Sequence, residues 1–94
     1  MAIEVFRNGR VLRWSNDTQA VTKHAMASRV TEMSIVRRHR EGWQNLDALV
    51  LVRFADGAEA CIPFDAYWQA HEWCLQRTEH NRNFAEAVIV DPEL

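Results

Sequence analysis

Two alternating apolar runs joined by an Asp-Gly pair occupy residues 46–64, and this stretch constrains the fold more than any other part of the chain. Such a pattern is a strong signal for a β-hairpin. A two-residue loop would set Phe54 opposite Glu59, whereas a three-residue loop with Gly57 in a left-handed bulge sets Arg53 opposite Glu59. The second register also matches apolar residues across the strands: Val50 with Ile62, Val52 with Ala60 and Phe54 with Ala58. The patterning therefore predicts the three-residue loop.

Four further strands are predicted, two of them in a second hairpin. Residues 3–14 alternate around an Asn-Gly pair, which favours a two-residue type I′ turn with Val5 facing Leu12. Residues 31–40 alternate up to the turn at 41–45, and residues 84–91 form a closing strand ended by a proline. The strand at 31–40 completes a three-stranded meander with the central hairpin, and the closing strand is separate from it.

One long helix is predicted over residues 65–80, with Asp65 as its N-cap. At about 100° per residue, one arc is polar and the rest is mostly apolar. The polar arc holds Gln69, Glu72, Gln76, Glu79 and His80, and the apolar remainder holds Ala66, Tyr67, Trp68, Ala70, Trp73, Cys74 and Leu75.

A short helix is also predicted over residues 17–27. Possible N-caps precede it, and Ala20, His24 and Ala27 recur at near-helical spacing. An irregular strand is the alternative, because Val21 and Thr22 are β-branched.

These elements predict an α+β fold in which an antiparallel sheet of five to six strands carries the long helix on one face. The chain has 94 residues, 48% of them hydrophobic and 26% charged, which is the balance of one globular domain spanning residues 1–94. That layout hosts many functions and selects none.

No membrane span or secretion signal is visible, so we expect a cytoplasmic protein. The two cysteines, Cys61 and Cys74, are expected to be reduced core residues. Because His71 lies three residues before Cys74, a metal or nucleophilic thiol site is the alternative, although structural zinc needs four ligands. No catalytic motif or phosphate loop occurs, so we predict neither a cofactor nor an enzyme.

The densest charged segment runs from Arg37 to Arg40 and is followed by Trp43. Arginine binds phosphate or carboxylate groups through paired hydrogen bonds, and tryptophan is enriched at interface hot spots. We therefore predict that Arg37, Arg38, Arg40 and Trp43 bind a partner. The alternative is that Trp43 folds back over the end of the sheet while the arginines stay solvated.

The residue pattern best fits a non-enzymatic protein-binding module. One version is a small phage or plasmid inhibitor, of the anti-CRISPR, antirestriction or immunity kind, that occludes a site on a larger protein or nucleoprotein complex. Residues 1–55 carry nine basic and five acidic side chains, against two and eight in residues 56–94. Such a split can support electrostatic docking.

The alternative function is nucleic-acid binding by the arginine-rich strand and first hairpin, which the pI of about 6.0 disfavours. A homodimer through a sheet edge is a further possibility.

Overall fold

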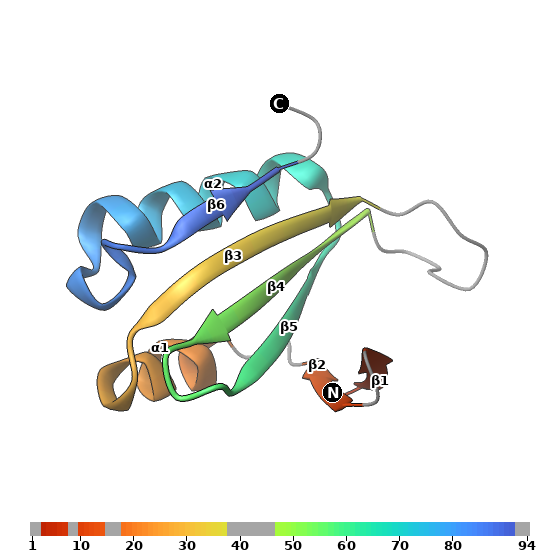
Figure 1. The fold of residues 1–94 in the computed structure, drawn as a ribbon. Coiled ribbons are helices and arrows are strands. Elements are labelled where there is room, and N and C mark those ends of the chain that lie inside the picture. The colour runs from red at the N-terminus through yellow and green to blue at the C-terminus, as the bar shows by residue number, and fades with distance from the viewer. Residues whose placement is uncertain (1–2, 8–9, 15–17, 38–46, 92–94) are drawn as a thin grey trace.

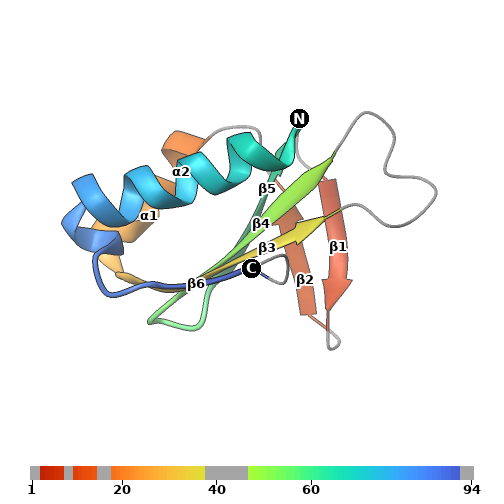
Figure 2. The ribbon, with the colours of Figure 1, turned by 90° about the horizontal axis from the view of Figure 1, so that it is seen from above.

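The computed structural model describes residues 18–37 and 47–91 in full, and residues 3–7 and 10–14 as backbone. The α+β class is confirmed, with two α-helices on one face of a sheet (Figure 1, Figure 2). In chain order the elements are β1 (Ile3–Arg7), β2 (Arg10–Trp14), α1 (Thr18–Ala27), β3 (Val30–Arg37), β4 (Ala48–Phe54), β5 (Glu59–Phe64), α2 (Tyr67–His80), the 3-10 helix η1 (Arg82–Phe84) and β6 (Val88–Val90).

The sheet is mixed, so the prediction of a purely antiparallel sheet is wrong. Strands β5, β4, β3 and β6 form its main part, and the β1–β2 hairpin extends it to the order β1-β2-β5-β4-β3-β6. The meander β3–β4–β5 is antiparallel, but β2 pairs with β5 and β6 pairs with β3 in parallel. In both cases a helix carries the chain back along the sheet before the next strand begins, which is the connection that parallel pairing needs.

Both predicted hairpin registers are confirmed. In the first hairpin Val5 pairs with Leu12 and Glu4 with Arg13. In the second, Arg53 pairs with Glu59, and Gly57 has φ 91°, the left-handed conformation that the three-residue loop requires. The loop closes through a hydrogen bond of 3.0 Å from the Gly57 amide to the Phe54 carbonyl.

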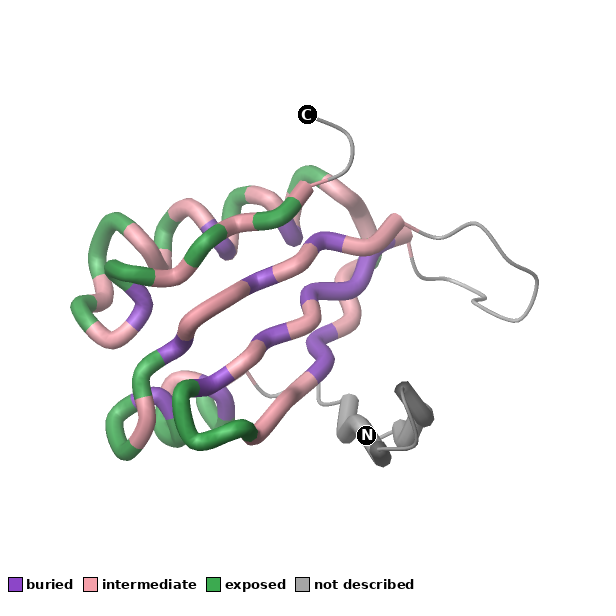
Figure 3. Tube along the Cα trace, viewed as in Figure 1, coloured by how far each residue is buried: buried purple, intermediate pink, exposed green. Residues whose placement is uncertain are grey.

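The core lies between the helices and the sheet. Along β3 and β4 buried residues alternate with more exposed ones, as Figure 3 shows. The largest buried side chains of this core are Phe84, Met33, Ile35 and Ile62. The helix-free face is also apolar in part, because Leu49 and Cys61 are buried there as well. On that side the β1–β2 hairpin runs away from the helix layer (Figure 2), and Trp14 of β2 pairs with Cys61 of β5.

The segment at 17–27 is a helix, as predicted, with α1 spanning Thr18–Ala27. Its buried face differs from the expected one, because Val21 and Ala25 enter the core while His24 is exposed. Val21 and Ala25 are four residues apart and therefore share a face. The β-branched Val21, which had favoured a strand, is the residue that anchors this helix.

The long helix α2 is confirmed, but it begins at Tyr67 and not at Asp65. The predicted Asp65 cap is wrong: Ala66 occupies the N-cap position and makes no side-chain cap hydrogen bond. The Tyr67 amide instead donates to the carboxylate of Asp47, at 2.8 Å. An acidic side chain distant in the sequence therefore satisfies one of the unpaired amides at the helix start.

Candidate binding surfaces

Arg37, the first residue of the predicted binding set, is held within the molecule. It ends β3, and its guanidinium carbon lies 4.7 Å from the ring centroid of Tyr67. One guanidinium nitrogen is 3.5 Å from the Asp47 oxygen that also accepts from the Tyr67 amide. Its side chain is 36% exposed. Arg37 therefore contributes a cation–π contact and an ion pair to this corner of the fold, with part of its surface left for a partner.

The other three residues of that set, Arg38, Arg40 and Trp43, lie outside the residues that the structure describes. So does the predicted turn at 41–45. Their assignment to a partner stays a prediction.

Tyr67 joins three elements at one corner of the molecule. Its hydroxyl donates to the carboxylate of Asp91, just after β6. Its ring stacks on His71 with centroids 6.0 Å apart, and Arg37 of β3 packs on the same ring. The end of β3, the start of α2 and the end of β6 are thus fixed relative to one another.

Trp68 projects from this corner into solvent. It is 68% exposed, although its sequence position had placed it on the apolar arc of the helix. Ala70 and Cys74 define the buried face of α2, and Trp68 lies about 160° around the helix from Ala70. A helix with seven apolar positions among its first eleven predicted residues cannot bury all of them, and the sequence pattern alone did not indicate which one would stay outside.

Strand β6 adds two more exposed apolar side chains, which the sequence reading did not single out. Val88 is 60% exposed and Val90 is 42% exposed. Ile89 between them packs against the core. The sequence offered the last strand as one possible edge of the sheet, and the structure places β6 there.

The cysteines do not form a joint site. Cys74 belongs to the core cluster beneath the helices, whereas Cys61 precedes Ile62 of that core and so points to the opposite face of β5. Both are fully buried. Burial raises the pKa of the Cys74 thiol to about 12, and the negative charge of Asp91 adds to the shift. Among the described residues, no three His, Cys, Asp or Glu side chains gather as a metal site would require.

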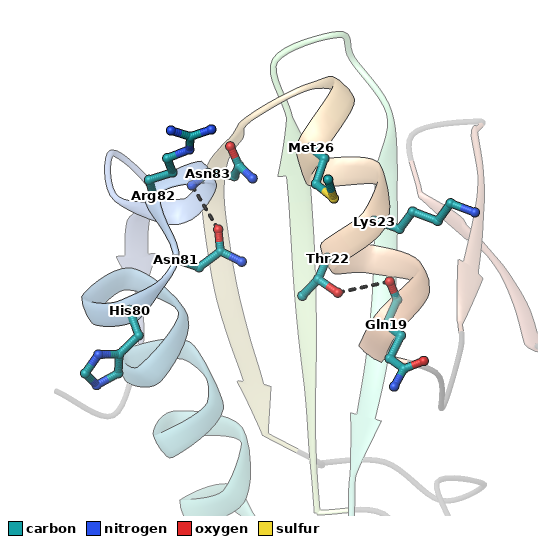
Figure 4. A pocket seen from close by; sticks show the side chains of 8 residues that line it. All are labelled: Gln19, Thr22, Lys23, Met26, His80, Asn81, Arg82 and Asn83. Atoms are coloured by element: carbon teal, nitrogen blue, oxygen red, sulfur yellow. Dashed lines mark hydrogen bonds between the residues drawn. The ribbon is translucent and has the colours of Figure 1, made fainter.

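A shallow groove of about 490 Å³ lies between α1 and the end of α2. Its walls are the outward face of α1 and the turn into η1, and the lining residues are Gln19, Thr22, Lys23, Met26, His80, Asn81, Arg82 and Asn83. In Figure 4, Lys23 extends away from α2 and His80 extends away from α1. The Asn81 side chain is already used, since it accepts from the Asn83 amide at 2.9 Å. These three side chains therefore do not converge on a small ligand in the groove.

Within the described ranges, neither α1 nor α2 has the length and apolar character that crossing a bilayer requires. Comparisons of the chain with protein-family models, with curated proteins and with solved structures give no match.

Proposed function

We propose that the protein is a non-enzymatic protein-binding module that acts in the cytoplasm by occupying a site on a larger protein or nucleoprotein complex. A small inhibitor or accessory protein of a phage or plasmid, of the anti-CRISPR, antirestriction or immunity kind, is the version we favour. The observation that carries the proposal is the exposure of Trp68, 68% of whose surface faces solvent at a fixed corner of the fold.

Trp68 has the properties of an interface anchor. Tryptophan supplies a large apolar surface with few rotatable bonds, and it is enriched among the residues that dominate binding energy. The backbone beneath it is fixed, because the adjacent Tyr67 is bound to Asp47 through its amide and to Asp91 through its hydroxyl. A side chain displayed on a rigid element loses less entropy on binding than one on a loose segment.

The predicted arginine segment starts beside this anchor. Arg37 stacks on Tyr67, the neighbour of Trp68, and Arg38, Arg40 and Trp43 follow Arg37 within six residues of the sequence. In this proposal, Trp68 and Trp43 supply apolar contacts, and the arginines pair with acidic groups of the target. Arginine beside tryptophan is a frequent composition of binding hot spots.

A capture experiment with a matched pair of variants tests this surface. Tagged wild type, Trp68→Ala and Met26→Ala are incubated with lysate of the host, with and without nuclease, and the bound proteins are read by mass spectrometry. Met26 is the control because it is also exposed, at 77%, but lies on α1. Circular dichroism confirms that each variant is folded.

We expect wild type and Met26→Ala to retain the same stoichiometric protein after nuclease treatment, and Trp68→Ala to lose it. Equal capture by Trp68→Ala would remove Trp68 from the interface. Recovery that depends on intact nucleic acid would instead favour the nucleic-acid alternative.

A further inference from the structure

Strand β6 is the last strand of the sheet, and among the described residues it is held on one side only. It pairs with β3 through three residue pairs, Glu32 with Val88, Met33 with Ile89 and Ser34 with Val90. Within the described part of the chain no strand pairs with its outer edge. An open edge presents backbone N–H and C=O groups that can pair with another strand.

The exposed side chains of β6 make this edge apolar as well as open. The pairing with β3 puts Val88 and Val90 on the face opposite to Met33, which is in the core, so both valines lie on the helix-free face. Together with Met26 and Trp68, they are the large hydrophobic side chains that the described residues expose. Soluble proteins commonly protect an edge strand with lysine or proline, and Val88–Val90 contains neither.

We infer that β6 pairs with β6 of a second copy of this chain, antiparallel and about a two-fold axis at Ile89. In this register Val88 lies opposite Val90 of the second copy, Ile89 lies opposite its own equivalent, and Ala87 lies opposite Asp91. An axis perpendicular to the sheet keeps the two helix layers on one side, so the four valines meet on the helix-free face. The two sheets become one continuous sheet.

Strand β6 is complementary to itself, which favours a second copy of this chain over a strand of another protein as its partner. Its exposed residues are two valines placed symmetrically around Ile89, so antiparallel pairing sets valine against valine. No like charges face each other: Asp91 meets an alanine, and its carboxylate already accepts from Tyr67. Pro92 follows directly and lacks an N–H, so the pairing ends there. A two-fold contact is closed and uses the β6 edge of both copies.

The test compares wild type, Val88→Lys and Met26→Lys by sedimentation equilibrium over a range of concentrations. Met26→Lys also replaces an exposed apolar side chain with lysine, at a more exposed residue on α1. Each lysine at position 88 would lie opposite a valine and diagonal to the other lysine. We expect dimers for wild type and Met26→Lys, and a dissociation constant raised about tenfold or more for Val88→Lys.

A mixture of two variants tests the register. In a dimer of Val88→Lys with Val90→Glu, the new lysine lies opposite the new glutamate, whereas each variant alone sets its two like charges diagonal to each other and against valine. We expect each variant alone to be largely monomeric and their mixture to form a heterodimer. Circular dichroism shows whether each variant keeps the wild-type fold, and Val90→Glu replaces Val88→Lys as the single test if the latter does not fold.

A monomeric wild type, a dimer that survives Val88→Lys, or a mixture that fails to associate would each overturn the inference. The inference does not depend on the target-binding role of Trp68. Trp68→Ala should no longer bind the target and should remain dimeric. Target binding and dimerisation can therefore fail independently of each other. Dissociation by Trp68→Ala would place the dimer contact on α2 instead of β6.

Discussion

His24 of α1 and Asp56 in the β4–β5 loop lie 2.9 Å apart, from the imidazole Nε2 to a carboxylate oxygen. The His24 ring also meets Phe54 edge to face, with centroids 4.5 Å apart. Two further hydrogen bonds join the β4–β5 loop to the end of α1: the Asp56 amide donates to the Ser28 hydroxyl, and the Ala55 amide donates to the Arg29 carbonyl. The far end of the central hairpin is thus bound to the end of α1.

Asp56 should make the fold sensitive to acid. A hydrogen bond from the Ala58 amide and the neighbouring His24 lower the pKa of its carboxyl below 3.8, and partial desolvation opposes them. A lowered pKa in the folded state stabilises the protein above the ordinary value and loses that contribution as pH falls through the lowered value. We expect Asp56→Asn to be less stable than wild type at neutral pH, with the difference shrinking towards about pH 3. Urea unfolding at neutral and at acidic pH measures the difference in unfolding free energy between the two proteins. A difference that does not change with pH would contradict a stabilising role of the Asp56 carboxylate.

The helix start should depend on Asp47 and not on Asp65. Asp47→Ala removes the acceptor of the Tyr67 amide and the ion pair with Arg37. Loss of a capping side chain costs about 1 kcal/mol of unfolding free energy. Asp65→Ala is the matched control and should change stability by less than about 0.5 kcal/mol. Denaturant unfolding measures the loss of unfolding free energy in each variant. Equal losses would mean that Asp65 also caps the helix.

Cys74 should be unreactive in the folded protein. Its thiol is fully buried and has a pKa of about 12, so almost no thiolate forms at mildly alkaline pH. Cys61 is equally buried. We expect iodoacetamide to modify neither residue until denaturant is added, as followed by mass spectrometry. Rapid labelling of Cys74 in native buffer would show that α2 opens readily.

Gly57 should be required for its backbone conformation alone. Its φ is 91°, and a Cβ placed there would meet no atom within 4 Å. Gly57→Ala should therefore lower the unfolding free energy by about 1 kcal/mol through strain, and Gly57→Asn by less, because asparagine tolerates positive φ better. Thermal unfolding of the two variants gives the comparison. An alanine variant as stable as wild type would mean that the loop adopts another turn.

The sequence predicts the parts of this fold that local chemistry decides. Both hairpin registers follow from turn residues and from matching apolar faces, and α2 follows from its periodicity. The parallel pairings of β2 and β6 do not follow from local sequence, because the neighbour of each strand depends on where a helix returns the chain. The cap of α2 was missed for the same reason, since Asp47 is remote in sequence from Tyr67.

The candidate surfaces were predicted less well. The binding role of Arg37 stays a prediction, and its stacking on Tyr67 could not be read from the charge pattern. Trp68 and Val88 have sequence contexts much like those of buried residues, and only the arrangement of the helix and the edge strand exposes them. Exposure of a single apolar residue is a property of tertiary structure, which a pattern of apolar positions does not encode.

The parallel pairing of β6 with β3 also bears on the order in which the protein folds. Contacts within the β3–β4–β5 meander join segments close in sequence, whereas β6 must reach a strand made much earlier, and non-local pairings of this kind form slowly. Until β6 docks, the edge of β3 is open to strands of other molecules. We therefore expect the nascent chain to be most prone to aggregation between completion of the meander and arrival of its last strand.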